Sequence, residues 1–288
     1  SMAVNNFIAE VWAAQIFQNL QKSLVYAQAG VINRDYEGDI KGKGDTVRIV
    51  AHGPITIDNY NKSTGIGDPE ELDDASTVLE ITQAKFFNFR VEDIDKAQMQ
   101  VSLMESATQD AAYRLGDVAD QHVAGVMVAG AGARVGTVAS PIEFDLSEVL
   151  ANDAIIDLKT KLDEANVPGE GRFLVVPPWL TGILLKEGLV TRNVGWSGVE
   201  PAMKNGQVAR LYGFDILESN NVPVDTGTSQ VVAGTARACT FADSVNDVEA
   251  YRPEKFFADA LRGLHVYGAK VVDPSALVVL NCAVASGE

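Results

Sequence analysis

Basic residues are scarce in this sequence of 288 residues. Its 23 lysines and arginines face 39 aspartates and glutamates, which gives a net charge of -16 and a pI of about 4.6. Proteins that grip nucleic acid do so largely by neutralising phosphates with basic side chains. The charge balance therefore argues against a DNA-binding enzyme.

Cysteine and histidine are also rare. Cys239 and Cys282 are too few for a disulfide scaffold, and no second cysteine or histidine stands at zinc spacing from either. Both lie in apolar stretches, so we expect them to be buried and reduced. We expect His122 to be a polar core residue of a helix, and His52 and His265 to face solvent or a subunit contact. No metal site is predicted.

Long hydrophobic runs are absent. No apolar stretch approaches the roughly 20 residues that cross a bilayer, and no basic segment followed by an apolar one marks a secretory leader. We therefore expect no membrane contact and no export from the cell that makes the chain. With 47% hydrophobic and 22% charged residues the composition is globular, and the length suits one elaborate domain or two ordinary ones.

Catalytic and nucleotide-binding motifs are missing as well. Residues 130–136 resemble a dinucleotide fingerprint, but they follow a helix and the spacing is one residue too long. We interpret them as a helix end and a flexible turn. There is no Walker motif and no nucleophile elbow, and the acidic stretch 68–74 lacks the spacing of a calcium loop. No catalytic residue and no cofactor are predicted.

The elements that are present begin with an arm and a hairpin. Residues 5–20 carry an apolar stripe at helical spacing, and residues 25–44 lose periodicity, which indicates an arm outside the core. Period-two patterns over 47–57 and 79–91 predict the two strands of one long hairpin with an acidic tip at 58–75. A hairpin of this length has little of its own to pack against and needs a neighbour.

A single long helix is predicted over residues 93–129. Its buried positions follow alternating three- and four-residue steps, a heptad-like seam. The seam comprises Ile94, Ala97, Val101, Met104, Thr108, Ala111, Leu115, Val118 and His122. At 1.5 Å per residue the helix would be on the order of 55 Å long, so we expect a strut.

The rest of the chain alternates between helices and strands. Helices are predicted over 146–165 and 179–186, and strands over 172–176, 207–218, 230–241, 248–252 and 264–280, the last interrupted by Pro274. The pattern predicts a mixed body of helices and strands.

Three segments in this half carry a resemblance to a known family. They are Gly-Arg-Phe-Leu-Val-Val-Pro-Pro at 171–178, a segment at 206–220 and a segment at 266–280. The middle one, in which Gly-Gln-Val-Ala-Arg-Leu-Tyr-Gly-Phe leads into a strand, is the most specific. With the order of arm, hairpin, strut helix and mixed body, the whole chain resembles the major capsid proteins of tailed bacteriophages, whose fold is named after phage Hong Kong 97.

The resemblance implies a Hong Kong 97-type α+β fold in five segments. They are an N-terminal arm (1–43), an extended loop (44–92), a peripheral domain with a spine helix (93–143), an axial domain (144–246) and a return to the peripheral domain (247–288). It also implies a structural, non-catalytic protein that self-assembles into pentamers and hexamers of an icosahedral head shell. That virion shell would be assembled in the host cytoplasm with a separate scaffolding protein and a portal, and would enclose DNA without sequence-specific binding.

Subunit contacts are predicted at the hairpin tip, the arm and the spine helix. The tip candidates are Asp68, Glu70, Glu71, Asp73 and Asp74. The arm and spine candidates are Phe7, Trp12, Arg34, Lys41, Lys43 and Lys96, of which the cations are expected to meet the acidic tip of a neighbouring copy. Lys62 has no identifiable partner for the Lys–Asn bond that some relatives form, so no covalent cross-link is predicted.

Two alternatives stay open. An encapsulin, a bacterial protein cage of the same fold that holds enzymes, is similar in length but lacks so long an arm. A small-molecule enzyme on an α/β body would need a concave site with converging titratable groups, and the sequence offers no such cluster.

Overall fold

In a computed structural model of the chain, the described residues are 16, 18–20, 24–36, 40, 42–52, 62–63, 74–92, 103–144, 151–187, 207–255 and 258–285. Residues 16 and 18–20 are helical. The further helices of the described residues are α3 (Leu103–Gly130), α4 (Ala151–Glu164) and α5 (Pro178–Lys186), with short 3-10 turns η2 (Ala236–Ala238) and η3 (Pro274–Ala276). Their strands are β1 (Thr46–His52), β2 (Asp74–Glu80), β3 (Gln83–Glu92), β4 (Ala133–Val135), β5 (Ile142–Phe144), β6 (Arg172–Val176), β7 (Gln207–Leu211), β8 (Phe214–Glu218), β9 (Val224–Asp225), β10 (Thr228–Thr235), β11 (Cys239–Tyr251), β12 (Ala258–Val271) and β13 (Leu277–Val284).

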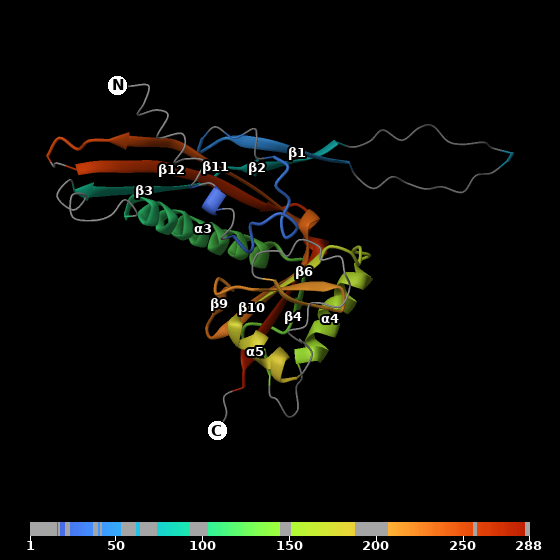
Figure 1. Ribbon diagram of the computed structural model, residues 1–288. Helices are drawn as coiled ribbons and strands as arrows, with labels where there is room; N and C mark the ends of the chain where they lie inside the picture. Colours follow the sequence, from blue (N-terminus) through green and yellow to red (C-terminus); the bar gives the residue numbers. More distant parts are fainter. Residues whose placement is uncertain are drawn as a thin grey trace, which may run out of the picture.

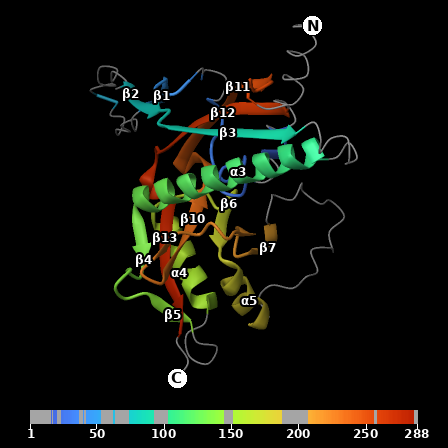
Figure 2. The same cartoon turned by 90° about the vertical axis from the view of Figure 1, so that its left-hand side faces the viewer.

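A three-stranded antiparallel sheet, in the order β11-β12-β3, forms the elongated part of the molecule (Figure 1). Successive side chains on a strand point to opposite faces, and on β3 this alternation sends Phe87 and Phe89 into the main hydrophobic core. Helix α3 packs along β12, between this sheet and the rest of the molecule (Figure 2). The sheet therefore has one face on the core and one face outward.

An eight-stranded mixed sheet forms the second part. Its order is β4-β13-β10-β6-β8-β7, with β5 paired to β13 and β9 paired to β10. All five residues of β6, Arg-Phe-Leu-Val-Val, are buried, as is typical of a strand covered on both faces. Helix α4 packs against β13 and against α5.

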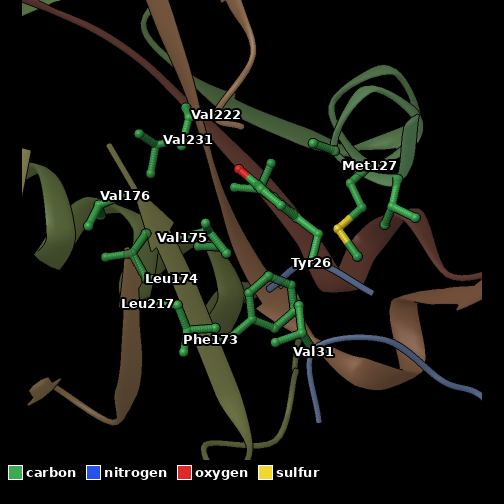
Figure 3. Close-up of a cluster of buried hydrophobic side chains, with 14 of the residues drawn as sticks. Tyr26, Val31, Met127, Phe173, Leu174, Val175, Val176, Leu217, Val222 and Val231 are labelled. Atoms are coloured by element: carbon green, nitrogen blue, oxygen red, sulfur yellow. The ribbon is translucent and has the colours of Figure 1, made fainter. Parts of the chain in front are cut away.

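One hydrophobic core joins the two parts, and the stretch 24–36, which we call the arm root, belongs to it. Figure 3 shows Tyr26 and Val31 of the arm root near Met127 of α3 and Phe173 of β6, all of them buried. The prediction that this stretch lies outside the core is therefore wrong. Its apolar side chains are buried by an irregular backbone, which leaves no periodicity in the sequence.

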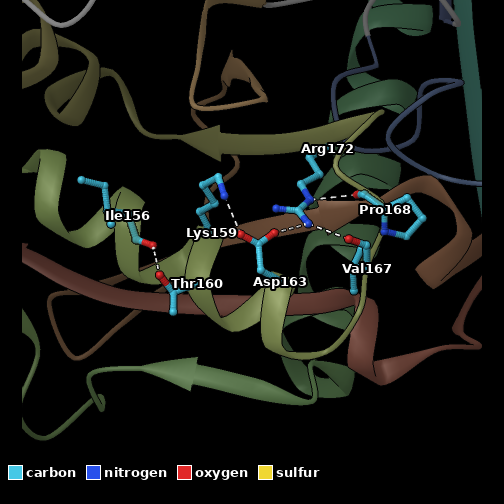
Figure 4. A network of polar contacts seen from close by, with 7 residues as sticks. All are labelled: Ile156, Lys159, Thr160, Asp163, Val167, Pro168 and Arg172. Atoms are coloured by element: carbon cyan, nitrogen blue, oxygen red, sulfur yellow. Dashed lines mark hydrogen bonds and ion pairs between the residues drawn. The ribbon is translucent and has the colours of Figure 1, made fainter.

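A buried arginine fixes the connection between α4 and β6. The guanidinium of Arg172 donates to Oδ1 of Asp163 at 2.7 Å and to the carbonyl oxygens of Val167 at 2.6 Å and Pro168 at 2.9 Å (Figure 4). Lys159 also donates to Asp163, and hydrogen bonds from Lys159 and Arg172 hold the pKa of that carboxyl below its ordinary value. The Arg172 contacts close the loop after α4.

Several predicted elements are confirmed. The strand at 172–176 is β6, the short helix is α5, and the interruption at Pro274 is η3, which separates β12 from β13. Helix α4 lies within the predicted 146–165, of which 146–150 lie outside the described residues. Cys239 and Cys282 are buried and free, and burial raises the pKa of each thiol to about 12.

Other strands differ from prediction. The stretch 207–218 is a hairpin of β7 and β8, because Tyr212 and Gly213 adopt φ values of 50° and 87°, and positive φ at both central residues is what a tight two-residue turn requires. Residues 130–136 are not a flexible turn, since they contain β4, which pairs with β13. The strand predicted over 230–241 is interrupted by η2, and β11 then continues to Tyr251.

Helix α3 is confirmed over its 28 described residues, which correspond to about 42 Å; residues 93–102 lie outside the described residues. Its predicted seam is partly wrong. Val118 is exposed and Ala111 half-buried, and the buried side includes Ala112, Ala119, Val123, Ala124 and Met127 beside Thr108 and Leu115. A straight α-helix drifts about 20° per heptad from a 3.5-residue repeat. Positions chosen at a strict seven-residue spacing therefore rotate around the helix and away from its buried side.

The two sheets do not follow the predicted segment boundaries. β11 enters the three-stranded sheet at Cys239, before the expected boundary at 246–247, and β13, inside the expected return segment 247–288, belongs to the eight-stranded sheet. The chain thus passes from one sheet to the other at η2 and again at η3. The division into peripheral and axial domains remains a prediction.

Candidate assembly interface

The predicted hairpin is present at its base. β1 and β2 pair antiparallel along all seven residues of each strand, from Thr46 opposite Glu80 to His52 opposite Asp74. Among the described strands they pair only with each other, and in Figure 1 they lie beside β11 and β12. A two-stranded ribbon is marginally stable alone, so β1 and β2 need contacts besides their own pairing.

The second strand of the hairpin is shorter than predicted. Apolar side chains fall on odd positions at 79–81 and 87–91, but Ala84 and Phe86 fall on even positions. β2 ends at Glu80 and β3, from Gln83 onward, pairs with β12. The change of partner thus coincides with a break in the alternation that the single predicted strand ignored.

The hairpin base rests on the outward face of the three-stranded sheet. Val47, Ile49 and Leu79 are buried in a small cluster with Ala242 of β11 and Val266 of β12. The cluster gives β1 and β2 one covered face and fixes them against β11 and β12.

Gly268 of β12 makes this close seat possible. A Cβ atom at Gly268 would lie 2.4 Å from the carbonyl oxygen of Glu80 and 3.1 Å from Cα of Ile81. The Nζ of Lys270 also donates to the carbonyl oxygen of Val78 at 2.8 Å. Because Gly268 has no side chain, the hairpin backbone at Glu80 and Ile81 can lie in contact with the backbone of β12.

Strand β3 presents an edge and an exposed aromatic side chain. Among the described strands only β12 pairs with β3, and an open strand edge is a template for pairing with another chain. Phe86 is 78% exposed, on the face opposite Phe87, and its cross-strand neighbour Leu264 is half-buried. This apolar pair lies next to the hairpin seat, since Leu264 also packs against the small cluster.

Arg34, one of the predicted subunit-contact residues, makes several contacts inside its own subunit. Its Nη1 donates to the carbonyl oxygen of Ala27 at 2.7 Å and its Nη2 to Oδ1 of Asp243 at 2.6 Å. The guanidinium carbon lies 5.2 Å from the centre of the Phe241 ring. These contacts tie the arm root to β11.

The three histidines have different surroundings. His265 is fully buried with Nε2 2.9 Å from Oδ2 of Asp243, so the prediction that it faces solvent or a subunit contact is wrong. A buried carboxylate compensates for the polar ring, and sequence spacing does not reveal that partner. His122 is half-buried edge-on to Tyr267, and burial, with a smaller effect of Lys85, lowers its pKa. His52 lies in β1, and its side chain is outside the described residues.

The remaining predicted contact residues are only partly described. Lys43 is exposed in the turn before β1, and Asp74 is the first residue of β2. Outside the described residues lie Phe7, Trp12, Lys41, Asp68, Glu70, Glu71, Asp73 and Lys96. The contact of the acidic tip with a neighbouring copy stays a prediction.

The described residues contain little that suggests chemistry. No group of three or more His, Cys, Asp or Glu among them could hold a metal ion, and none of their helices is long and apolar enough to span a bilayer. Sequence reasoning missed Phe86, Gly268 and the buried Asp120 and Asp243. Only Asp120 carried a signal in the sequence, because it is an acidic residue that directly follows Ala119 on the buried side of a helix.

Comparisons with known proteins agree with this architecture. Residues 74–280 match the family described as phage capsid protein. A structure from Mycobacterium phage Che8 is 30% identical, with a TM-score of 0.65, over 89% of this chain and 90% of that one. No curated protein matches.

More distant structures share the fold alone. The capsid of Ralstonia phage GP4 is 10% identical with a TM-score of 0.63, over 93% of this chain and 92% of that one. A virus-like particle from Pyrococcus furiosus is 15% identical with a TM-score of 0.58, over 94% and 98%. The fold is the Hong Kong 97-type α+β fold that the sequence predicted. The chain belongs to the phage capsid protein family and is a capsid shell protein.

Proposed function

We propose that this chain is the major capsid protein of a tailed phage, and that its pentamers and hexamers close into an icosahedral shell around packaged DNA. Membership of the phage capsid family supports a structural, non-catalytic role. The single observation that carries the assembly geometry is the hairpin of β1 and β2, which leaves its seat on β12 as a two-stranded ribbon. Such a ribbon gains its missing contacts on an adjacent copy.

The acidic hairpin tip meets cations of the neighbour in this proposal. Lys43, exposed beside the hairpin base, supports it, and Lys41 and Lys96 are the other candidates. Exposed ion pairs contribute only about 0–1 kcal/mol each, but a shell repeats every contact in every subunit. A net charge of -16 also suits a shell that must enclose DNA without holding it tightly.

The same proposal includes partners and compartments. A separate scaffolding protein directs assembly in the host cytoplasm, a portal occupies one vertex, and the mature shell is part of the virion. The segments 1–43, 44–92, 93–143, 144–246 and 247–288 act as arm, extended loop, peripheral domain, axial domain and peripheral return. Free, buried cysteines support a shell without disulfides.

An encapsulin-type cage is the second candidate. The similarity to the virus-like particle from Pyrococcus furiosus favours it, but at 15% identity that similarity concerns the fold, whereas the phage Che8 structure is 30% identical. Nuclease-protected DNA in purified particles supports the phage capsid, and an enclosed enzyme supports the cage.

Reversal of the tip charge tests the proposed contact. We expect the change of Glu70, Glu71, Asp73 and Asp74 to lysine to leave the subunit folded and to reduce shells in sedimentation velocity at 0.1 M salt. Changing the same residues to glutamine and asparagine is the matched control and should have a smaller effect. Wild-type assembly should weaken toward 1 M salt, where the Debye length falls from about 10 Å to about 3 Å. Normal assembly of the lysine variant at low salt would refute the electrostatic contact.

A further inference from the structure

A carboxylate of helix α3 is buried beneath the arm root. Asp120 is only 2% exposed. Its Oδ2 accepts the backbone N–H of Val25 at 2.6 Å and its Oδ1 accepts the backbone N–H of Ala27 at 3.0 Å. The backbone N–H of Tyr26, which lies between them in sequence, also hydrogen-bonds to this carboxyl group and lowers its pKa. A single side chain of the spine helix thus binds successive amides of a segment more than ninety residues away in sequence.

These amides need such a partner. The arm root buries Leu24, Tyr26 and Val31 in the core, but its backbone forms no helix, and its only strand pairing is in isolated bridges. A buried N–H group without an acceptor costs about 1–3 kcal/mol. Because Asp120 accepts from both Val25 and Ala27, it compensates for the irregular backbone at the point where the arm joins the core.

A second set of contacts holds the far end of the arm root. Asn33 donates its N–H to the carbonyl oxygen of Cys239 and accepts the N–H of Phe241, both at 2.9 Å. Arg34 links the two ends, because one nitrogen donates to Ala27 and another to Asp243. The segment is therefore fixed to α3 at one end and to β11 at the other.

We propose that Asp120 is a positioning residue for assembly, which sets the point and direction from which the chain before Ile16 reaches a neighbouring copy. The inference rests on the proposed capsid function. Ile16 and Leu20 are themselves buried in the same core, so they and the arm root share one set of packing neighbours. No contact of Asp120 with another subunit is required.

The charge on Asp120 makes this anchor sensitive to protonation. Burial raises the pKa of its carboxyl to about 6, the N–H groups of the arm root partly oppose that rise, and Asp117 adds to it. The phenol of Tyr26, also buried, is the other titratable group that faces it, and burial together with Asp120 raises the pKa of Tyr26. If the arm root left its place, Asp120 would regain water and its pKa would fall. The anchored form therefore binds the proton more tightly, and lower pH favours anchoring.

Hydrogen exchange on the unassembled wild-type chain and Asp120→Ala tests the anchor directly. Alanine removes both carboxyl oxygens and leaves the N–H groups of Val25 and Ala27 without this acceptor. We expect amides of the 24–28 stretch to exchange at least ten-fold faster, and closed shells to form in at least ten-fold lower yield. Asp110→Ala, which removes an exposed carboxylate of the same helix, should match wild type in both. Unchanged exchange in Asp120→Ala overturns the anchor, and faster exchange with normal shells overturns its role in assembly.

A pH series on the wild-type chain gives a test that needs no variant to fold. After correction for intrinsic exchange rates, protection of the 24–28 amides should rise several-fold between pH 7.5 and pH 5. Where Asp120→Asn folds, its protection should not change with pH. Wild-type protection that stays constant or falls toward pH 5 contradicts the proposal. Because exchange is measured on unassembled subunits, failure of wild type to form shells would refute the capsid function and leave this result intact.

Discussion

Asp243 and His265 form a fully buried pair, with Oδ2 of the carboxylate 2.9 Å from Nε2 of the ring. The other oxygen of Asp243 lies 2.6 Å from Arg34. A carboxylate only accepts hydrogen bonds, so Nε2 of His265 carries the hydrogen. One aspartate thus satisfies two buried donors, one on β12 and one on the arm root.

Removal of this carboxylate should be costly. Asp243→Ala leaves the guanidinium of Arg34 and the ring of His265 without their acceptor, and breaking a buried ion pair costs about 3–5 kcal/mol. Glu249→Ala, which breaks the exposed pair with Arg262 in the same sheet, should cost about 0–1 kcal/mol. Urea denaturation of both variants checks the difference. Equal midpoints would mean that the buried pair contributes no more than an exposed one.

Stability should depend on pH through Asp120. Its folded pKa of about 6 lies above the ordinary value of 3.8, so the folded state binds a proton that the unfolded state releases. This group adds stability below pH 4 and loses it as pH rises through 6. Relative to Asp120→Asn, wild type should gain about 1 kcal/mol between pH 7.5 and pH 5. His122, with a lowered pKa, acts in the opposite direction in both proteins and cancels in the comparison.

The seat of the hairpin should not tolerate a methyl group. Gly268→Ala brings Cβ into the backbone of Glu80 and Ile81, and overpacking costs about 1–3 kcal/mol. Gly125→Ala is the control, because a Cβ there meets nothing within 4 Å and alanine favours a helix by about 1 kcal/mol. Thermal unfolding should move in opposite directions in the two variants. Faster amide exchange in β2 of Gly268→Ala would locate the effect at the hairpin.

Substitutions at Phe86 and Phe87 should have different effects, the first on assembly and the second on the stability of the subunit. Phe86→Ser removes an exposed ring, and surface changes usually stay within about 0.5 kcal/mol; we therefore expect a stable subunit with fewer shells. Phe87→Ala empties a buried site and should cost about 3–5 kcal/mol. Denaturation and sedimentation of both variants check this. Normal assembly of Phe86→Ser would show that its exposed ring does not lie in a contact.

The sequence predicted those parts of the fold that depend on periodicity. The apolar run of β6 and the break at Pro274 are local signals, and the alternation in β1 and β2 predicted the hairpin. The switch from β2 to β3 coincides with a break in the alternation, since Ala84 and Phe86 are apolar at even positions, but the break does not identify β12 as the new partner. Ladder partners are set by contacts between distant segments.

Three of the missed residues, Asp120, Asp243 and Gly268, each depend on a distant partner. Asp120 meets Val25 and Ala27, Asp243 meets Arg34, and Gly268 meets Glu80. Local spacing identifies none of these pairs. The acidic tip, by contrast, can be recognised from its composition alone. Its proposed partner lies on another copy of the chain.

Electron microscopy of particles assembled from the purified chain, with its scaffolding protein where one is required, tests the central claim most directly. The proposal predicts closed icosahedral shells of fivefold and sixfold capsomers, in which the hairpin of β1 and β2 lies over an adjacent subunit. Single subunits or irregular aggregates under every condition would contradict it, as would closed shells whose hairpin folds back on its own subunit.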